Sequence, residues 1–98
     1  MPTYRRAFVK GATYFFTVVT YGRLPILTTF ESRPILHDAW LDVRGRYPFV
    51  TVAVCLLPEH LHCIWALPEG DAGYPLRRKE IKRLFTKRYL ARAGPGRL

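Results

Sequence analysis

The stretch Leu56–Leu67, with the sequence LLPEHLHCIWAL, decides the fold because two apolar runs in it flank a short polar break. Pro58 and Glu59 fill the break, and this composition predicts the turn of a β-hairpin. Side chains alternate between the two faces of a strand, so His60 and His62 would project from one face and could hold a metal ion or a phosphate. In a helix the same side chains would point about 200° apart. A strand beginning at His60 therefore predicts a two-histidine site.

The strand before this turn is predicted to be Phe49–Leu57, which is nearly continuously apolar and rich in valine. Such a run is typical of a central strand buried on at least one face. A two-residue turn would place Leu61, Cys63, Trp65 and Leu67 on an apolar face with Leu56, Val54, Val52 and Val50. The opposite face would hold His60, His62, Ile64 and Ala66 with Leu57, Cys55, Ala53 and Thr51. A β-bulge would change these assignments on one strand.

Further from the hairpin, the pattern of apolar residues predicts one more strand and two helices. Residues 13–20 are dense in β-branched and aromatic side chains and predict the first strand. A helix follows, capped by Thr28 or Thr29 and ending near Gly45, with an apolar stripe that includes Ile35 and Ala39. After the Gly- and Pro-rich loop 68–75 comes a second helix. This order predicts an α+β fold with helices against the apolar face of a mainly antiparallel sheet, and a further strand is expected.

The second helix, over residues 77–92, carries most of the positive charge. Eight Lys and Arg side chains against Glu80 alone leave +7 of the protein's net charge of +9. Ile81, Leu84 and Phe85 supply its apolar stripe. Like charges four residues apart destabilise an isolated helix, and a bound phosphate backbone would relieve them. A solvated charged face is the alternative, but the imbalance of sign favours a cationic surface that attracts nucleic acid to the histidine cleft.

Length and composition limit the class of protein. Ninety-eight residues suffice for a single domain, 1–98, with a modest core, and 49% apolar residues argue against disorder. The apolar runs are shorter than the roughly 20 residues of a membrane span, and no secretory signal follows Met1, so a cytoplasmic location is expected. Cys55 and Cys63 lie in apolar runs and are predicted to be buried, reduced thiols.

Basic residues stand at both ends of the first strand. Arg5, Arg6 and Lys10 precede it, and Tyr21–Arg23 follows. Together with the aromatic side chains of residues 13–20, they suit a groove that tracks a nucleic-acid backbone and stacks its bases. Packing of the same rings in the core is the alternative interpretation.

Two other histidine and cysteine patterns have less specific interpretations. His37 lies on the first helix away from its apolar stripe and is predicted to be a solvated surface residue. The predicted hairpin register brings Cys55 opposite His62, which leaves a structural zinc site as an alternative for the histidine pair, although four ligands are not apparent.

Several motifs together resemble one family. They are PEHLH at 58–62 followed by Ile64-Trp65, LPEGD at 67–71, Glu80-Ile81-Lys82 with Phe85-Thr86, and the opening Tyr4-Arg5-Arg6, Lys10-Gly11 and YFFTV at 14–18. This combination resembles the REP-associated tyrosine transposases, relatives of the single-tyrosine transposases within the HUH nuclease superfamily. The resemblance covers nearly the whole chain, although the His-x-His pair alone would be a weak signal.

The resemblance implies a ferredoxin-like (RRM-like) fold and a bacterial, nucleoid-associated protein that cleaves single-stranded or hairpin DNA. In that family a divalent cation, Mg²⁺ or Mn²⁺, would be held by His60 and His62 against the scissile phosphate. A tyrosine attacks and leaves a 5′-phosphotyrosine link and a free 3′-hydroxyl. The residues expected to bind DNA are Arg5, Arg6, Lys10, Arg78, Lys79, Lys82, Arg83, Phe85 and Lys87.

The nucleophile is where this sequence departs from the family pattern. The family's tyrosine lies in a later segment resembling Asp-Tyr-Ile-x-x-Asn-Pro, and nothing in these 98 residues corresponds to it. Tyr89 on the basic helix is a weak candidate, for which packing or DNA contact is the alternative role. The chain is therefore expected to be a truncated member. Three functions stay open: a metal-dependent transposase or nuclease, a DNA-binding remnant without chemistry, and a basic oligomerisation module that forms a homodimer.

Overall fold

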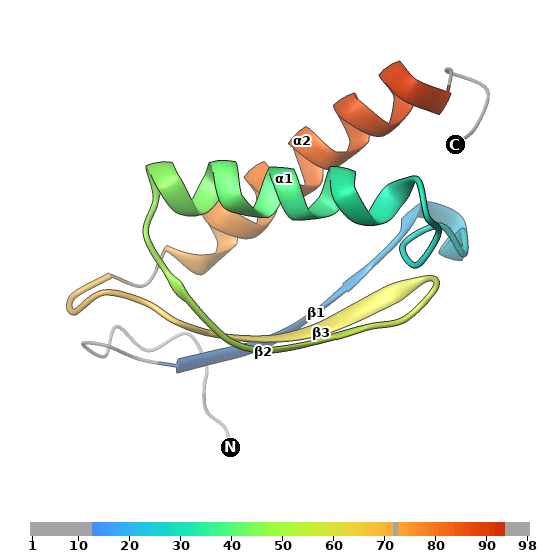
Figure 1. Cartoon of the computed structure of the whole chain (residues 1–98). Helices are drawn as coiled ribbons and strands as arrows, with labels where there is room; N and C mark the ends of the chain where they lie inside the picture. Colours follow the sequence, from blue (N-terminus) through green and yellow to red (C-terminus); the bar gives the residue numbers. More distant parts are fainter. Residues whose placement is uncertain (1–12, 72, 94–98) are drawn as a thin grey trace.

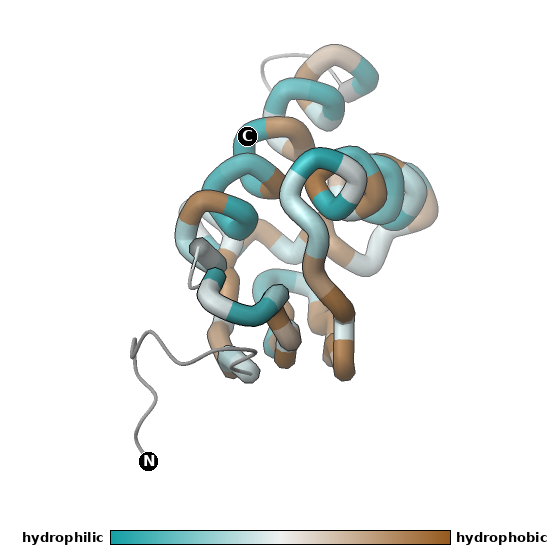
Figure 2. The backbone as a smooth tube through the Cα atoms, turned by 90° about the vertical axis from the view of Figure 1, so that its left-hand side faces the viewer, coloured by the Kyte–Doolittle hydropathy of each residue, from teal (hydrophilic) through white to brown (hydrophobic). Residues whose placement is uncertain are grey.

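The computed structural model describes residues 13–71 and 73–93 and shows two layers, a sheet and a pair of helices (Figure 1). The sheet is antiparallel with strand order β1-β3-β2, and both helices cover the same face of it (Figure 2). The predicted α+β arrangement is confirmed. In chain order the elements are β1 (Thr13–Val19), the 3₁₀ helix η1 (Tyr21–Arg23), α1 (Ser32–Arg46), β2 (Val50–Leu56), β3 (His60–Ala66) and α2 (Tyr74–Ala93).

Strand β3 lies in the centre of the sheet and alternates strictly between a buried and a half-buried side chain. Leu61, Cys63 and Trp65 face the helices and are at most 3% exposed. His60 and His62 lie on the other face, which no helix of the described residues covers. The alternation of side chains predicted from the sequence therefore places the core residues on one face of β3 and the candidate site on the other.

Strand β1 follows the same alternation. Tyr14 and Phe16 are buried under the helices, whereas Phe15 between them is 59% exposed on the opposite face. Its antiparallel pairing with β3 sets Thr17 opposite His62. The aromatic residues of this strand are thus divided between core packing and an exposed surface, the two roles that the sequence left open.

Strand β2 corrects two predictions. It lies at an edge of the sheet and is not central, so Val50, Val52 and Val54 are each more than half exposed. A valine-rich run is compatible with either position, because β-branched side chains favour strands whether or not a second neighbour covers them. Cys55 is also exposed on this strand and is not the buried thiol expected, whereas Cys63 is buried. Burial raises the pKa of the Cys63 thiol to about 12.

The predicted hairpin register holds only near the turn. Cys55 pairs with His62 as predicted, but a bulge between Thr51 and Ala53 shifts the rest of the ladder by one residue. Thr51 therefore lies opposite Trp65 on the helix face, where its hydroxyl accepts a hydrogen bond of 2.9 Å from Trp40 Nε1. Val50 pairs with Ala66 instead of contributing to the apolar face. A one-residue bulge reverses the faces of every side chain beyond it.

The helices bury the stripes that their spacing predicted. Helix α1 starts at Ser32, whose backbone N–H donates to Thr29 Oγ1 at 3.1 Å, so the threonine hydroxyl lies just ahead of the first turn. Its residues Ile35, Ala39 and Val43 are at most 5% exposed. Helix α2 begins at Tyr74, before Pro75, which is tolerated because a helix's first turn needs no intrahelical N–H donor. Neither helix of the described residues is long and apolar enough to cross a bilayer.

Arg77 on α2 is only 3% exposed, although the sequence counted it with the cations of a charged surface. Its hydrogen bonds form a buried cluster, here called the Arg77 clamp. Its Nη1 and Nη2 donate to the two carboxylate oxygens of Asp71 at 3.1 and 2.8 Å. The remaining donors reach the carbonyl oxygens of Tyr47, Pro48 and Gly73 at 2.9 to 3.0 Å. Arg77 thereby joins the corner between α1 and β2 to the start of α2.

The clamp predicts a pH-dependent loss of stability in Asp71→Asn. The hydrogen bond from Arg77 holds the pKa of Asp71 below its ordinary value. The stabilisation is therefore complete above about pH 4, the pKa of an unfolded Asp, and is lost as pH falls through the lower folded pKa. We expect a cost of about 1 kcal/mol at pH 7, limited by solvent screening, that shrinks below pH 4. Urea unfolding at several pH values measures it.

Asp42→Asn is the matched control, because Asp42 pairs with Arg88 at a surface where its side chain is 51% exposed. We expect a cost under about 0.5 kcal/mol from this change. Equal losses from the two variants would contradict a special role for the Arg77 clamp.

Candidate metal-binding and nucleic-acid-binding face

The two histidines of β3 form a pair on the uncovered face of the sheet. The ring centroids of His60 and His62 lie 4.9 Å apart, with the ring planes at 80° to one another. The predicted common face is therefore confirmed by the geometry. Both side chains are half-buried, so the rings are reachable from solvent but held by their neighbours.

The Nδ1 atoms of both rings face protein oxygens. His62 Nδ1 lies 2.9 Å from the Thr17 hydroxyl, and His60 Nδ1 is buried 3.4 Å from Glu59 Oε1. The second contact is within ion-pair range but does not meet hydrogen-bond geometry. Within residues 13–71 and 73–93, neither Nε2 atom has a hydrogen-bond partner. A proton on each Nδ1 would leave both Nε2 lone pairs free, as is usual for histidines that bind a metal through Nε2.

A divalent cation fits this pair as a partial site. The imidazoles offer two nitrogen ligands, and in the described part of the chain no group of three or more His, Cys, Asp or Glu side chains is placed to hold a metal. Although Cys55 pairs with His62, it does not complete a cluster, so the alternative of a structural zinc site is not supported. A cation bound here would need further ligands, such as water or phosphate oxygens.

Phe15 adds an exposed aromatic ring beside the histidines. Its centroid lies 6.0 Å from that of His62, and the two rings are nearly parallel at 12°. From composition alone, Phe15 is not distinguished from the other aromatic residues of this strand. The alternation of the strand could have found it, because Tyr14 and Phe16 must face the core if Phe15 faces the histidines.

The cationic helix lies on the other side of the sheet, so it does not form a cleft with the histidines as expected (Figure 1). Of the basic residues predicted to bind DNA on α2, Lys79, Lys82, Arg83 and Lys87 are exposed and Arg78 is half-buried. Arg83 donates to Glu80 at 2.9 Å, and this hydrogen bond lowers the pKa of the Glu80 carboxyl. The Arg78 guanidinium lies 6.0 Å from the centre of the Phe16 ring.

Two residues of α2 pack in the core, Phe85 on the predicted apolar stripe and Tyr89 in the packing role given as its alternative. Phe85, expected to contact DNA, is 8% exposed and packs in the core. Tyr89, the weak candidate for the nucleophile, is 3% exposed, stacks on Phe85, and lies on the layer opposite the histidines. It cannot reach a phosphate held at the pair.

Four further residues were considered from the sequence as surface or DNA-binding positions. His37 is exposed on α1, as expected. Arg5, Arg6 and Lys10 lie outside the described residues.

The fold and the histidine pair together define a ferredoxin-like α+β domain with a two-imidazole site on the open face of its sheet. Comparison with known proteins identifies homologues of this chain. A REP-associated tyrosine transposase of Escherichia coli K12 is 45% identical over 86 residues, which is 88% of this chain and 52% of that protein. A Haemophilus influenzae protein assigned to the same group is 41% identical over 89% of this chain and 49% of its own length. The chain is thus a homologue of the REP-associated tyrosine transposases, as its motifs predicted.

A solved structure supports this relationship, and a second one supports the fold. A REP-associated tyrosine transposase bound to a REP hairpin is 44% identical and has a TM-score of 0.74, over 89% of this chain and 52% of the other. A protein of Deinococcus radiodurans described as a transposase shares the fold, with a TM-score of 0.62, 20% identity and coverage of 93% and 68%. No protein-family model matches the chain. The chain spans about half the length of the curated relatives it matches.

The contact between Thr17 and His62 predicts a measurable effect on metal binding. Thr17→Val removes the oxygen that faces Nδ1, so the ring loses the partner that orients it, and we expect Mn²⁺ binding to weaken about tenfold. Paramagnetic broadening of the histidine ring signals during a Mn²⁺ titration measures the change, with exposed His37 as an internal reference. Thr13→Val, on the same strand but opposite Ala66, should have no effect. Equal broadening of all three histidines would contradict a site at the pair.

Proposed function

We propose that this chain provides the metal- and DNA-binding platform of a transposase-type endonuclease that acts on single-stranded or hairpin DNA. The observation that carries the proposal is the pair His60 and His62, whose Nδ1 atoms face Thr17 and Glu59 while their Nε2 atoms have no hydrogen-bond partner among the described residues. Homology to the REP-associated tyrosine transposases, one of which is described bound to a REP hairpin, supports it.

His60 and His62 would hold Mg²⁺ or Mn²⁺, and the cation would neutralise charge that develops on the phosphate oxygens. Nitrogen ligands favour Mn²⁺ of the two, because Mg²⁺ prefers an all-oxygen shell. Thr17 and Glu59 face the Nδ1 atoms and orient the two rings, so the Nε2 side of each ring stays open toward the proposed DNA. A bacterial, nucleoid-associated location in the cytoplasm follows as part of this proposal.

The attacking tyrosine is a separate requirement. Of the tyrosines in the described residues, Tyr14 and Tyr89 are buried on the helix side and Tyr74 stacks on Tyr14. Tyr21 and Tyr47 lie in η1 and just after α1, off the three strands of the sheet. Strand cleavage through a phosphotyrosine therefore requires a tyrosine other than Tyr14, Tyr74 or Tyr89, from another segment or another protomer.

DNA binding without chemistry is the second candidate function, favoured by this placement of the tyrosines. It differs from the first in its dependence on the histidines, because binding through cations and aromatic rings survives their loss. A third candidate, a homodimer formed through the open sheet face, is suggested by half-buried Ile64 and Ala66.

A labelled REP-type hairpin with a single-stranded extension tests the proposal. In Mn²⁺ we expect binding whose log K falls linearly with log salt, because phosphate contacts release counterions. His60→Ala with His62→Ala should remove the Mn²⁺-dependent part of the binding and leave the salt-dependent part. Binding that ignores Mn²⁺ and the double variant would favour the second function, and a stable dimer without DNA affinity would favour the third.

Phe15 gives a second prediction for the same face. Its ring is 59% exposed beside His62, and stacking on an unpaired base is sequence-tolerant. We expect Phe15→Ala to weaken binding of single-stranded DNA about tenfold and Phe15→Trp to retain it, with quenching of the new indole fluorescence. Phe30→Ala is the control, because that ring is 93% exposed but lies outside the sheet. Equal effects of the two alanine variants would rule out stacking at Phe15.

A further inference from the structure

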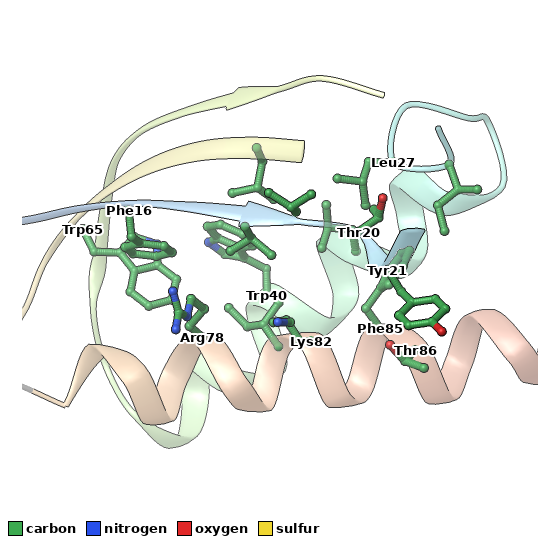
Figure 3. Close-up of a pocket in the computed structure, with 16 residues that line it drawn as sticks. Phe16, Thr20, Tyr21, Leu27, Trp40, Trp65, Arg78, Lys82, Phe85 and Thr86 are labelled. Atoms are coloured by element: carbon green, nitrogen blue, oxygen red, sulfur yellow. The ribbon is translucent and has the colours of Figure 1, made fainter. Parts of the chain in front are cut away.

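A cavity of about 270 Å³ lies between the end of β1 and the two helices, on the side of the sheet away from the histidine pair (Figure 3). Aromatic rings of Phe16, Trp40 and Phe85 form part of its wall. Drug-sized ligands occupy pockets of about 300 to 1,000 Å³, so this cavity suits a single planar ring system and not a packed peptide helix.

The charged side chains that line the cavity are all cationic. Arg78 and Lys82, one turn apart on α2, both line the cavity, and no Asp or Glu of the described residues does so (Figure 3). Arg78 already lies over the face of Phe16, with 6.0 Å between the guanidinium carbon and the ring centroid. Aromatic walls with cations at the edge complement a ligand that is planar and apolar in one part and anionic in the next. A nucleobase with its flanking phosphates has this chemistry.

Tyr21 stands at the mouth of the cavity beside Thr86 (Figure 3). Its side chain is 85% exposed. The turn that holds it is unusual, because Gly22 and Arg23 both adopt positive φ, at 62° and 55°. A non-glycine residue rarely takes this conformation without support from its surroundings, and such residues cluster at functional sites. The turn presents an aromatic ring to solvent where an entering base would stack.

The cavity and the histidine pair lie near the same end of β1, on opposite sides of the sheet. Val19 lines the cavity and is the cross-strand partner of His60. Among the described residues β1 pairs only with β3, so its outer edge leaves a path from one face of the sheet to the other. A single DNA strand could cross this edge and contact both sites.

We propose that this cavity binds one unpaired nucleobase of the DNA strand that passes the histidine pair, with Arg78 and Lys82 contacting its flanking phosphates and Tyr21 stacking on the base. The inference rests on the proposed function, since it assigns a second contact to the same DNA ligand. It gives the predicted DNA-binding cations of α2 a contact with the DNA, although the helix lies on the opposite side of the sheet from the histidines.

The experiment uses a hairpin oligonucleotide in which 2-aminopurine replaces successive unpaired bases, titrated with the full chain. We expect one position to show a large change of fluorescence on binding. Lys82→Ala should weaken binding about tenfold and abolish that signal, because it removes a phosphate contact at the cavity. Lys79→Ala removes the same charge from the same helix outside the cavity, and should weaken binding less than about threefold while keeping the signal.

A pocket-filling variant tests the cavity without a change of charge. Thr86→Trp places an indole at the rim, and we expect it to remove the 2-aminopurine signal while the protein melts cooperatively. Tyr21→Ala avoids any effect on core packing and should also reduce the signal.

The contradicting outcomes are distinct. Equal weakening by Lys82→Ala and Lys79→Ala, with no responsive base, would overturn the cavity proposal and leave the proposed function intact if binding still depends on His60 and His62. A dimer that dissociates in Thr86→Trp, with an unchanged base signal, would assign the cavity to a second copy of the chain. No DNA binding by the unmodified chain would overturn both proposals.

Discussion

The period-two alternation of β3, in a sheet covered on one face only, is the constraint on which the remaining structure depends. Trp65 is fully buried on the helix side, stacked on Phe49 with centroids 4.1 Å apart and edge-on to Phe16 at 4.6 Å. A register slip of one residue would turn this indole to solvent and bring the histidines under the helices. Both changes are unfavourable, so burial of Trp65 also maintains the outward direction of His60 and His62.

The two layers separate the two surfaces on which the proposed function depends. The open face carries the imidazoles and an exposed aromatic ring, and its neighbouring strand supplies the hydroxyl that orients His62. The helix layer carries the excess of positive charge. Because the two surfaces lie on opposite sides of the sheet, the proposed DNA ligand would contact both by passing around an edge, and β1 is the edge that borders the cavity.

The +7 helix is stable partly because not all of its charge is free. Three of its arginines form ion pairs: Arg77 with Asp71 in the buried clamp, Arg83 with Glu80, and Arg88 with Asp42 on α1. These contacts relieve some of the repulsion that the sequence implied, so a bound polyanion is not needed to explain the helix. Among the described residues, the positive charge that is not in an ion pair therefore lies on fewer residues than composition suggested. Arg78 and Lys82 are two of these residues, and both line the cavity.

Local pattern in the sequence was enough to determine the strands, the helices and the shared face of His60 and His62, whereas the family was indicated by the resemblance of its motifs. Strand alternation and helical spacing act between near neighbours, which is why they could be read without a structure. The packed structure was needed to show that β2 is an edge, that a bulge turns Thr51 to the helix face, and that Arg77 is buried. Each of these depends on which distant segments lie against a residue, and one chain's local pattern does not contain that information.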